Sequence, residues 1–264
     1  MIKPSLVLLP GAGNHTPDPS VFRTHVDDPT SFEIIRYPGW RRYVEKDFSA
    51  NSLVEELANE IARRTGRGPI RIIGMSIGGH LGYAAALKLE SSGRRVDGLC
   101  AIDSFMVSNA SPSPGWTKRA FGRGVQLLRK RRTGDFVQYL RSLFWRTVVR
   151  STGARLTPLC DFMATHGAAS LLSADHLLEE ELSMRLLLRH VNPWIPSLDL
   201  IPTALKAPTI LLRTQATAVH DKAWRKRCPN IRILEIAGQH GSLFEAENVG
   251  SLNRAFVAAT FDWR

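Results

Sequence analysis

The fold of this chain is decided by one stretch of sequence, Arg71-Ile72-Ile73-Gly74-Met75-Ser76-Ile77-Gly78-Gly79-His80. A β-rich apolar run over 69–73 leads into it, and a helix-forming run over 81–89 follows. The pattern predicts a strand, a sharp turn and a helix, with Ser76 at the apex of a G-x-S-x-G turn. Such a turn strains the serine backbone and lifts the hydroxyl out of the fold, where a base reaches it. A side chain at either outer glycine of this motif would block the close passage of strand and helix.

The rest of the chain alternates between strand and helix patterns. Besides the strand before Ser76, strands are expected over 6–9, 32–36, 96–102, 209–213 and 231–236. Helices are expected from a capping box of Ser52 and Glu55 to about 64, over 81–89 and over 249–259. This order predicts one α/β domain, 1–264, with a mostly parallel sheet and helices on both faces. Residues 116–191 are helical in pattern, so we expect 111–200 to form a helical lid between two late strands.

Composition and cysteine usage restrict the class of protein. The chain has 264 residues, of which 44% are hydrophobic and 22% charged, as in ordinary globular proteins. No stretch approaches the roughly 20 apolar residues of a membrane span, and the first residues do not read as a signal peptide. Cys100, Cys160 and Cys228 form no disulfide or zinc pattern, which fits a reducing, cytoplasmic location. The histidines show no ligand spacing, so we expect no metal.

The net charge of +11 is concentrated in one segment. Between 116 and 155 the chain has 11 basic residues and one acidic residue, Asp135, for a local charge of +10. A concentrated positive field steers anionic ligands, so an anionic partner is expected, and a merely solubilising basic face is the alternative. No nucleic-acid recognition motif accompanies the charge, and we do not expect nucleic-acid binding.

Three residues fit the order serine, acid, histidine that this turn implies. A serine hydroxyl needs a base, and the base needs a partner that orients it. His240 comes directly after the last expected strand and is the candidate base. Asp103 ends the strand 96–102 and is the favoured acid, because catalytic groups gather at the carboxyl ends of such strands. The alternative acid is Asp221, which looks like the start of a helix.

A developing oxyanion needs two backbone amides aimed at it. One is expected from Ile77, which follows the candidate nucleophile, and the other from Gly11 or Ala12 in the loop after the first strand. This loop is not a dinucleotide fingerprint, because it lacks the third glycine and the following helix.

With these motifs the chain resembles the thioesterase family of the α/β hydrolases, the product-releasing domains of nonribosomal peptide and polyketide synthases. The resemblance covers almost the whole chain and rests on five stretches, 9–13, 74–84, 93–96, 102–104 and 237–240. Chain-terminating members place the acid where Asp103 stands. Many stand-alone editing members place it after the later strand, where residues 212–217 here contain no acid. Met75 and Gln239 depart from the usual residues without removing a triad member.

The resemblance implies a serine thioesterase. The acyl, peptidyl or polyketide chain would arrive as a phosphopantetheine thioester on an acidic carrier protein, pass to the serine, and leave by hydrolysis or cyclisation. The enzyme would need no cofactor of its own. Carrier docking is expected on part of the basic segment, the run Arg129, Lys130, Arg131 and Arg132.

Two other functions are open. An esterase or lipase acting on free or membrane-derived esters would keep the same catalytic residues. The lid segment contains an apolar stripe that could favour this function, formed by Phe136, Val137, Leu140, Leu143, Phe144 and Val148. A basic amphipathic helix of this kind lies on anionic membranes, although such stripes usually face a core and we expect this one to pack over the active-site cleft. The third function is a non-catalytic, hydrolase-like scaffold that binds an anionic partner.

Overall fold

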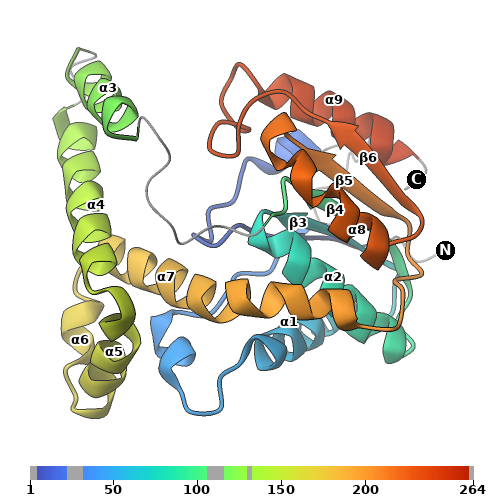
Figure 1. Ribbon diagram of the computed structural model, residues 1–264, viewed down its shortest axis with the longest axis horizontal. Helices are drawn as coiled ribbons and strands as arrows, with labels where there is room; N and C mark the ends of the chain where they lie inside the picture. Colours follow the sequence, from blue (N-terminus) through green and yellow to red (C-terminus); the bar gives the residue numbers. More distant parts are fainter. Residues whose placement is uncertain (1–4, 23–31, 106–115, 130–132, 262–264) are drawn as a thin grey trace. The chain divides into compact units, whose positions relative to one another are not determined.

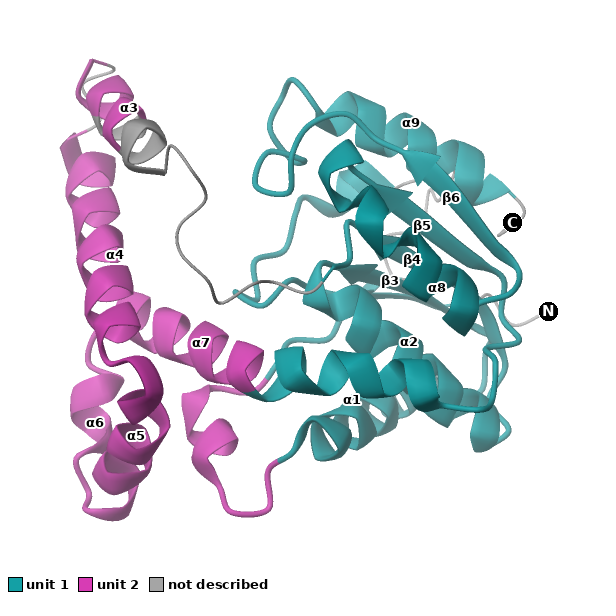
Figure 2. Cartoon of the chain, viewed as in Figure 1, with its two compact units in different colours: residues 1–37, 49–106, 190–264 teal, residues 38–48, 107–189 magenta. Residues whose placement is uncertain are grey.

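The computed structural model describes residues 5–22, 32–105, 116–129 and 133–261 (Figure 1). The chain divides into two compact units, shown in Figure 2. The first comprises residues 1–37, 49–106 and 190–264, and the second comprises residues 38–48 and 107–189. The first unit contains the sheet, and the second is helical where it is described.

The sheet has six strands, all parallel to their neighbours. Their order is β2-β1-β3-β4-β5-β6. The strands are β1 (Ser5–Leu9), β2 (Phe32–Ile34), β3 (Ile70–Met75), β4 (Val96–Ile102), β5 (Thr209–Arg213) and β6 (Ile231–Glu235). Because the strands run the same way, their carboxyl ends meet at one edge, which is where sites form in such sheets.

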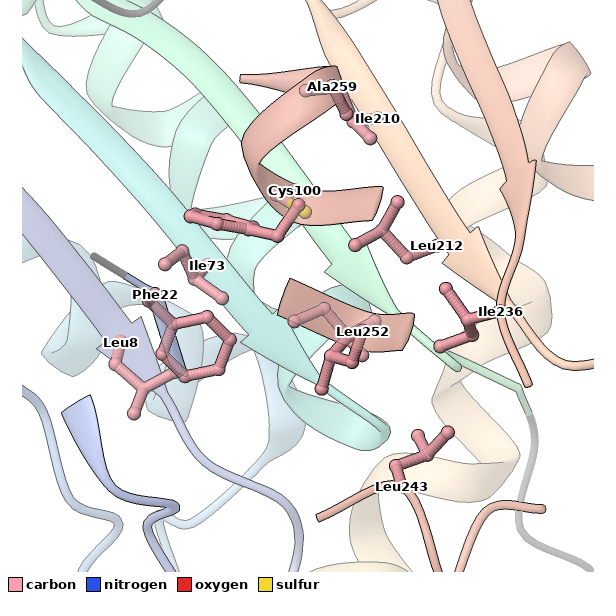
Figure 3. Close-up of a cluster of buried hydrophobic side chains, with 12 residues drawn as sticks. Leu8, Phe22, Ile73, Cys100, Ile210, Leu212, Ile236, Leu243, Leu252 and Ala259 are labelled. Atoms are coloured by element: carbon pink, nitrogen blue, oxygen red, sulfur yellow. The ribbon is translucent and has the colours of Figure 1, made fainter. Parts of the chain in front are cut away.

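Helices cover both faces of this sheet, as the alternating pattern predicts. On one face α2 (Ile77–Ser91) packs so closely that Leu9, Ile72 and Leu99 lie within 3.4 Å of a Cβ built on Gly82. On the other face, residues adjacent to these in the same strands join α9 (Val249–Ala259) in a buried cluster (Figure 3). The cluster includes Leu8, Ile73, Cys100, Leu252 and Phe256. Burial on both faces explains why the strands are almost continuously apolar.

The start of α1 (Ala50–Thr65) differs from the predicted one. The capping box is formed by Ser49 and Ser52, not by Ser52 and Glu55. The Ser52 amide donates to the Ser49 hydroxyl at 3.0 Å, and the Ser49 amide donates to the Ser52 hydroxyl at 2.9 Å. The prediction was wrong because it took glutamate as the residue at the third helical position. Ser52 fills that position here and accepts the bond from the Ser49 amide, so the helix starts earlier. Glu55 instead pairs with Lys88 at 3.2 Å.

Shorter elements complete the first unit, namely η1 (Pro19–Phe22), η5 (Ile195–Leu200), η6 (Gln215–His220) and α8 (Asp221–Arg227). The second unit contains η3 (Trp40–Val44), α3 (Trp116–Arg129), α4 (Thr133–Ser151), η4 (Gly153–Arg155), α5 (Leu156–Thr165), α6 (Ala169–Leu172) and the first part of α7 (His176–Trp194). As the sequence predicts, the described residues between β4 and β5 form helices and no strand. The second unit holds most of the expected insertion 111–200 but also 38–48, whereas 190–200 lies in the first.

Close backbone contacts explain the glycines of the turn at Ser76. A Cβ on Gly78 would lie 2.5 Å from the carbonyl oxygens of Leu9 and Pro10, and one on Gly74 would lie 2.3 Å from the carbonyl oxygen of Gly78. Backbone atoms cannot move aside as flexible side chains do. We therefore expect Gly78→Ala to lower the free energy of unfolding by at least about 2 kcal/mol, measured by urea denaturation.

Gly82→Ala is the matched control on the same helix. A Cβ there would meet only side-chain atoms at 3.2–3.4 Å, and alanine favours the helix over glycine. Its free energy of unfolding should stay within about 1 kcal/mol of the wild type. Equal urea midpoints for the two variants would contradict this account of the turn.

Candidate active site

Ser76 lies between β3 and α2, where the sequence places the apex of the turn. Its backbone has φ 54° and ψ −122°, a conformation that L-residues rarely adopt. The Ser76 amide donates to the Ile102 carbonyl at 2.8 Å, which ties the turn to the end of β4. The residue is 8% exposed. The strained serine backbone that the motif predicts is therefore present, and it lies at the carboxyl edge of the sheet.

Backbone strain gathers at this edge. Among the residues that the structure describes, three other than glycine have a positive φ: Asn14 at 55°, Ser76 at 54° and Asp103 at 45°. They follow β1, β3 and β4 respectively, which are neighbours in the sheet. Such conformations cost free energy and are concentrated at functional sites, so the strain marks this edge as the candidate site.

His240 and Asp103 are brought together across 137 positions of sequence. The Nδ1 atom of His240 lies 2.8 Å from Oδ2 of Asp103. The Asp103 side chain is fully buried, whereas that of His240 is 40% exposed. A proton on Nδ1 makes the imidazole the donor of this bond and leaves Nε2 free to act as a base. The Phe105 ring packs edge-on against the His240 ring, with centroids 4.6 Å apart.

The other oxygen of Asp103 accepts three further hydrogen bonds. The Thr214 amide and hydroxyl both lie 2.9 Å from Oδ1, and the Thr217 hydroxyl lies 2.7 Å from it. Burial alone would raise the pKa of Asp103, but the bonds from His240, Thr214 and Thr217 outweigh it and lower the pKa to about 2. The carboxylate is therefore ionised at neutral pH, as a partner for an imidazolium must be.

This lowered pKa makes stability depend on pH. The folded pKa of Asp103 is about 2 and its reference value is 3.8, so the ionised carboxylate stabilises the fold above pH 4. That contribution, roughly 2 kcal/mol, is lost as the pH falls from about 4 to about 2. Asp103→Asn should therefore lose less free energy of unfolding than the wild type over this range, measured by urea denaturation at each pH. Parallel losses in the two proteins would contradict the assignment.

The rival acid, Asp221, has a different partner. It is the first residue of α8, and its two carboxylate oxygens accept bonds from Arg213 Nε at 3.1 and 3.3 Å. Arg213 also binds Glu235 at 2.6 Å. Asp221 is thus engaged in a charged network at the end of β5, while Asp103 contacts the histidine.

The loop after β1 lies beside the candidate nucleophile. A Cβ built on Gly11 would lie 3.7 Å from the Ser76 Cβ. Tyr37 holds this loop at both ends: its hydroxyl donates to the Pro10 carbonyl at 2.7 Å, and its amide donates to the Asn14 side chain at 2.8 Å. Ala12 is half-buried within the loop, next to Gly11.

Ile77 is the first residue of α2, so its amide has no partner within the helix. The expected amide donors thus come from a helix start and from a loop that side chains fix in place.

Sequence reasoning missed four residues of this site: Phe105, Tyr37, Thr214 and Thr217. The threonines follow β5, where residues 212–217 contain no acid and therefore gave no signal of a contribution to the site. Of the expected docking run, Arg129 is exposed at the end of α3, and Lys130, Arg131 and Arg132 lie outside the described residues. Within the described residues, no three histidine, cysteine or acidic side chains lie close enough together to hold a metal ion.

His80, in the first turn of α2, is a buried structural residue. Its Nδ1 lies 3.0 Å from the Arg227 guanidinium, and its ring stacks on Trp224 with centroids 5.2 Å apart. Burial lowers the pKa of His80 to about 3, and the positive charge of Arg227 adds to the effect. Trp224 donates in turn to the Ser104 carbonyl at 3.0 Å. This network therefore anchors the chain directly after Asp103.

Comparison with known proteins shows which proteins this chain resembles. The family model of the thioesterase domain matches residues 4–121. A 58-residue stretch is 45% identical to the non-reducing polyketide synthase PKS12 of Gibberella zeae, and it makes up 22% of this chain and 3% of that synthase.

Several solved structures share the fold over nearly the whole chain. The Vlm2 thioesterase domain has 18% identity and a TM-score of 0.55, covering 95% of this chain and 90% of its own. The NocB thioesterase domain, solved as a covalent complex with a fluorophosphonate nocardicin G analog, has 17% identity, a TM-score of 0.54 and coverages of 97% and 93%. The RedJ thioesterase of the Streptomyces coelicolor prodiginine pathway has 20% identity, a TM-score of 0.56 and coverages of 97% and 86%.

The fold is therefore that of the α/β hydrolases, with a parallel sheet, helices on both faces and a helical segment between β4 and β5. Within that class, the predicted resemblance to the thioesterase family is confirmed by the family model over residues 4–121, and the solved structures that share the fold are thioesterases or thioesterase domains.

Proposed function

We propose that this chain is a serine thioesterase that releases an acyl, peptidyl or polyketide chain from a phosphopantetheine thioester on a carrier protein. The observation that carries the proposal is the 2.8 Å bond between His240 and the buried Asp103, at the sheet edge that also holds the strained Ser76. A base oriented by a buried carboxylate, with a serine raised on such a turn, is the arrangement that acyl transfer needs.

In the first half of the proposed reaction, Nε2 of His240 takes the proton of the Ser76 hydroxyl, and the oxygen attacks the thioester carbonyl carbon. The Ile77 amide and the loop of Gly11 and Ala12 stabilise the tetrahedral oxyanion. The carbon–sulfur bond then breaks, and the phosphopantetheine thiol leaves with the proton held by His240. Asp103 stabilises the imidazolium throughout, and the product of this half is an ester on Ser76.

In the second half, His240 takes a proton from water, or from an amine or hydroxyl of the bound chain. The new nucleophile attacks the ester, and Ser76 leaves with that proton. Water gives a free acid, and an internal nucleophile gives a cyclic product. No step needs a cofactor of the enzyme's own, because phosphopantetheine belongs to the substrate.

The proposal is tested by mixing the protein with a carrier protein loaded with an acyl chain and following the carrier's intact mass. The carrier should lose the acyl group with wild type and retain it with Ser76→Ala. The mass of the released product separates acid from cyclic forms. A loaded carrier that stays unchanged with wild type, although small esters are cleaved, would favour the esterase function.

We propose that the lid segment is also where the carrier binds. Exposed apolar side chains lie on α3 and α4: Phe121, Leu128, Val137, Leu140 and Phe144. Arg129 is exposed at the end of α3, and Arg141, which pairs with Asp175 at 2.7 Å, is exposed on α4. An apolar surface with a basic surround is complementary to an acidic carrier with an apolar centre.

Reversing the charge of Arg129, Lys130, Arg131 and Arg132 should raise KM for the loaded carrier about tenfold or more. The kcat/KM for a small thioester without a carrier should stay unchanged, because the catalytic residues are untouched. A matched control reverses four exposed bases of the first unit, Arg67, Lys206, Arg225 and Lys226. Equal effects on the carrier and the small thioester, or equal effects of the two variants, would contradict the docking proposal.

The exposed stripe on α4 also favours a second candidate, an esterase at an anionic membrane. Val137, Leu140 and Phe144 were expected to pack over a cleft, and each is about half exposed. None of the helices within the described residues has the length and apolar character of a membrane crossing. Sedimentation with anionic vesicles discriminates the candidates, since a carrier-dependent thioesterase should stay in the supernatant.

We also propose a cytoplasmic location, which three free and buried cysteines support.

A further inference from the structure

We propose that Thr214 and Thr217 are positioning residues, which hold the Asp103 carboxylate in the one orientation that serves His240. The inference rests on the proposed function, because it assigns these residues to the same acyl-transfer site. Neither threonine carries an acid or a base of its own, and both act through Asp103.

The two oxygens of Asp103 have separate partners. Oδ2 lies 2.8 Å from His240 Nδ1, and Oδ1 takes the Thr214 amide, the Thr214 hydroxyl and the Thr217 hydroxyl at 2.7–2.9 Å. A carboxylate oxygen has about two lone-pair directions, so three donors saturate Oδ1 and leave Oδ2 for the histidine. The carboxylate therefore cannot turn about its bond to Cβ without breaking bonds at a buried charge.

The threonines are themselves fixed. Thr214 is the N-cap residue of η6 and Thr217 lies in its first turn; both are buried, with Thr214 fully inaccessible and Thr217 6% exposed. The Thr217 amide donates to the Thr214 carbonyl at 3.1 Å, which closes the turn. The Asp103 amide donates to the Leu212 carbonyl at 2.7 Å, so the backbone of the acid is tied to the same strand. Acid and hydroxyls are thus held on neighbouring strand ends.

The Thr217 hydroxyl has a single proton and three oxygen atoms within reach, of which the Thr214 hydroxyl is the most distant at 3.5 Å. The Thr217 hydroxyl lies 2.7 Å from Asp103 Oδ1 and 3.1 Å from the Thr214 carbonyl. The shorter distance and the negative charge favour the carboxylate, because bonds to ionised acceptors are the stronger ones. This hydroxyl therefore serves the acid, and its loss leaves a buried charge with one donor fewer.

Thr217→Val is the decisive variant, since it keeps the shape of threonine and removes only the hydroxyl. It should lower kcat about tenfold, with KM for a small thioester unchanged, because the lost bond is to a buried charge and Thr217 acts only through Asp103. Thr217→Ser keeps the hydroxyl and should stay within about threefold of wild type. The matched control is Thr209→Val: Thr209 is equally buried at the start of β5, and its hydroxyl donates to the Ala207 carbonyl instead.

Two further measurements distinguish a positioning role of Thr217 from a purely structural one. With fewer donors on Asp103, the pair of acid and histidine should hold its proton to higher pH, so the acidic limb of kcat/KM should move upward in Thr217→Val. In the Asp103→Asn background, Thr217→Val should have no further effect on kcat, because the carboxylate through which Thr217 acts is absent. Thr209→Val should leave the limb in place.

Proton NMR of His240 Nδ1–H tests the same proposal without turnover. The signal, identified by its loss in His240→Gln, should shift in Thr217→Val and stay unchanged in Thr209→Val. An unshifted signal, or an undiminished effect of Thr217→Val on kcat in the Asp103→Asn background, would overturn the proposal. Failure of the proposed function would look different, because wild type would then show no cleavage that depends on Ser76.

Discussion

His240→Ala is expected to lower kcat for thioester hydrolysis about 10⁶-fold, to the level that the oxyanion donors and substrate binding alone support. The imidazole is the only base that the proposed reaction uses, and it acts in both halves. Without it the Ser76 hydroxyl stays protonated at neutral pH, and the leaving thiol and the incoming water have no proton partner. The measurement is single-turnover hydrolysis of a small thioester, followed by release of the thiol.

The control for this variant is His166→Ala. His166 is an exposed histidine at the end of α5, and its Nδ1 atom lies 2.8 Å from the Phe162 carbonyl. Its removal should change kcat less than about threefold. A loss below about 100-fold in His240→Ala would mean that another group acts as the base, and would overturn the assignment of His240.

Asp103→Asn is expected to lower kcat about 10⁴-fold, with little change in KM. The amide fills the same space as the carboxylate, so the variant tests charge and hydrogen-bond direction more than packing. An asparagine NH₂ group facing His240 would turn the imidazole into the wrong tautomer, with its proton on the nitrogen that must accept one. The loss of the negative charge would also remove the stabilisation of the imidazolium.

Asp221→Asn answers the rival assignment of the acid. Its carboxylate pairs with Arg213, so its loss should lower kcat less than about fivefold. If Asp221→Asn lowered kcat more than Asp103→Asn, the role of the acid would have to be reassigned to Asp221, in the segment that follows β5.

Much of the fold follows from local sequence alone. The strands β4 and β5 begin and end where their apolar runs predict, because strands buried on both faces are almost continuously apolar. The helix α9 also has its predicted bounds, because its apolar residues recur at helical spacing. The start of α1 was misplaced by three residues, because Ser49 and Ser52 are both suitable N-cap residues and the sequence pattern alone does not distinguish them.

The candidate site was predictable where its side chains can act as a nucleophile, an acid or a base. The order of the strands and the residue types that can act as nucleophile, acid and base predict Ser76, Asp103 and His240 as candidates, and the structure brings His240 and Asp103 within 2.8 Å of each other. Thr214 and Thr217 have no such signature, because a threonine beside a carboxylate 111 positions away is a product of packing. The same holds for the stripe on α4, whose periodicity shows an amphipathic helix but not what covers it.

The central claim, an acyl-serine at Ser76, is tested most directly by intact-mass spectrometry after treatment with a fluorophosphonate. Wild type should gain one covalent adduct, and Ser76→Ala should gain none under the same conditions. Peptide mapping should place the adduct on the peptide that contains Ser76. An unlabelled wild-type protein, or equal labelling of Ser76→Ala, would contradict the account and leave a non-catalytic, hydrolase-like scaffold as the better description.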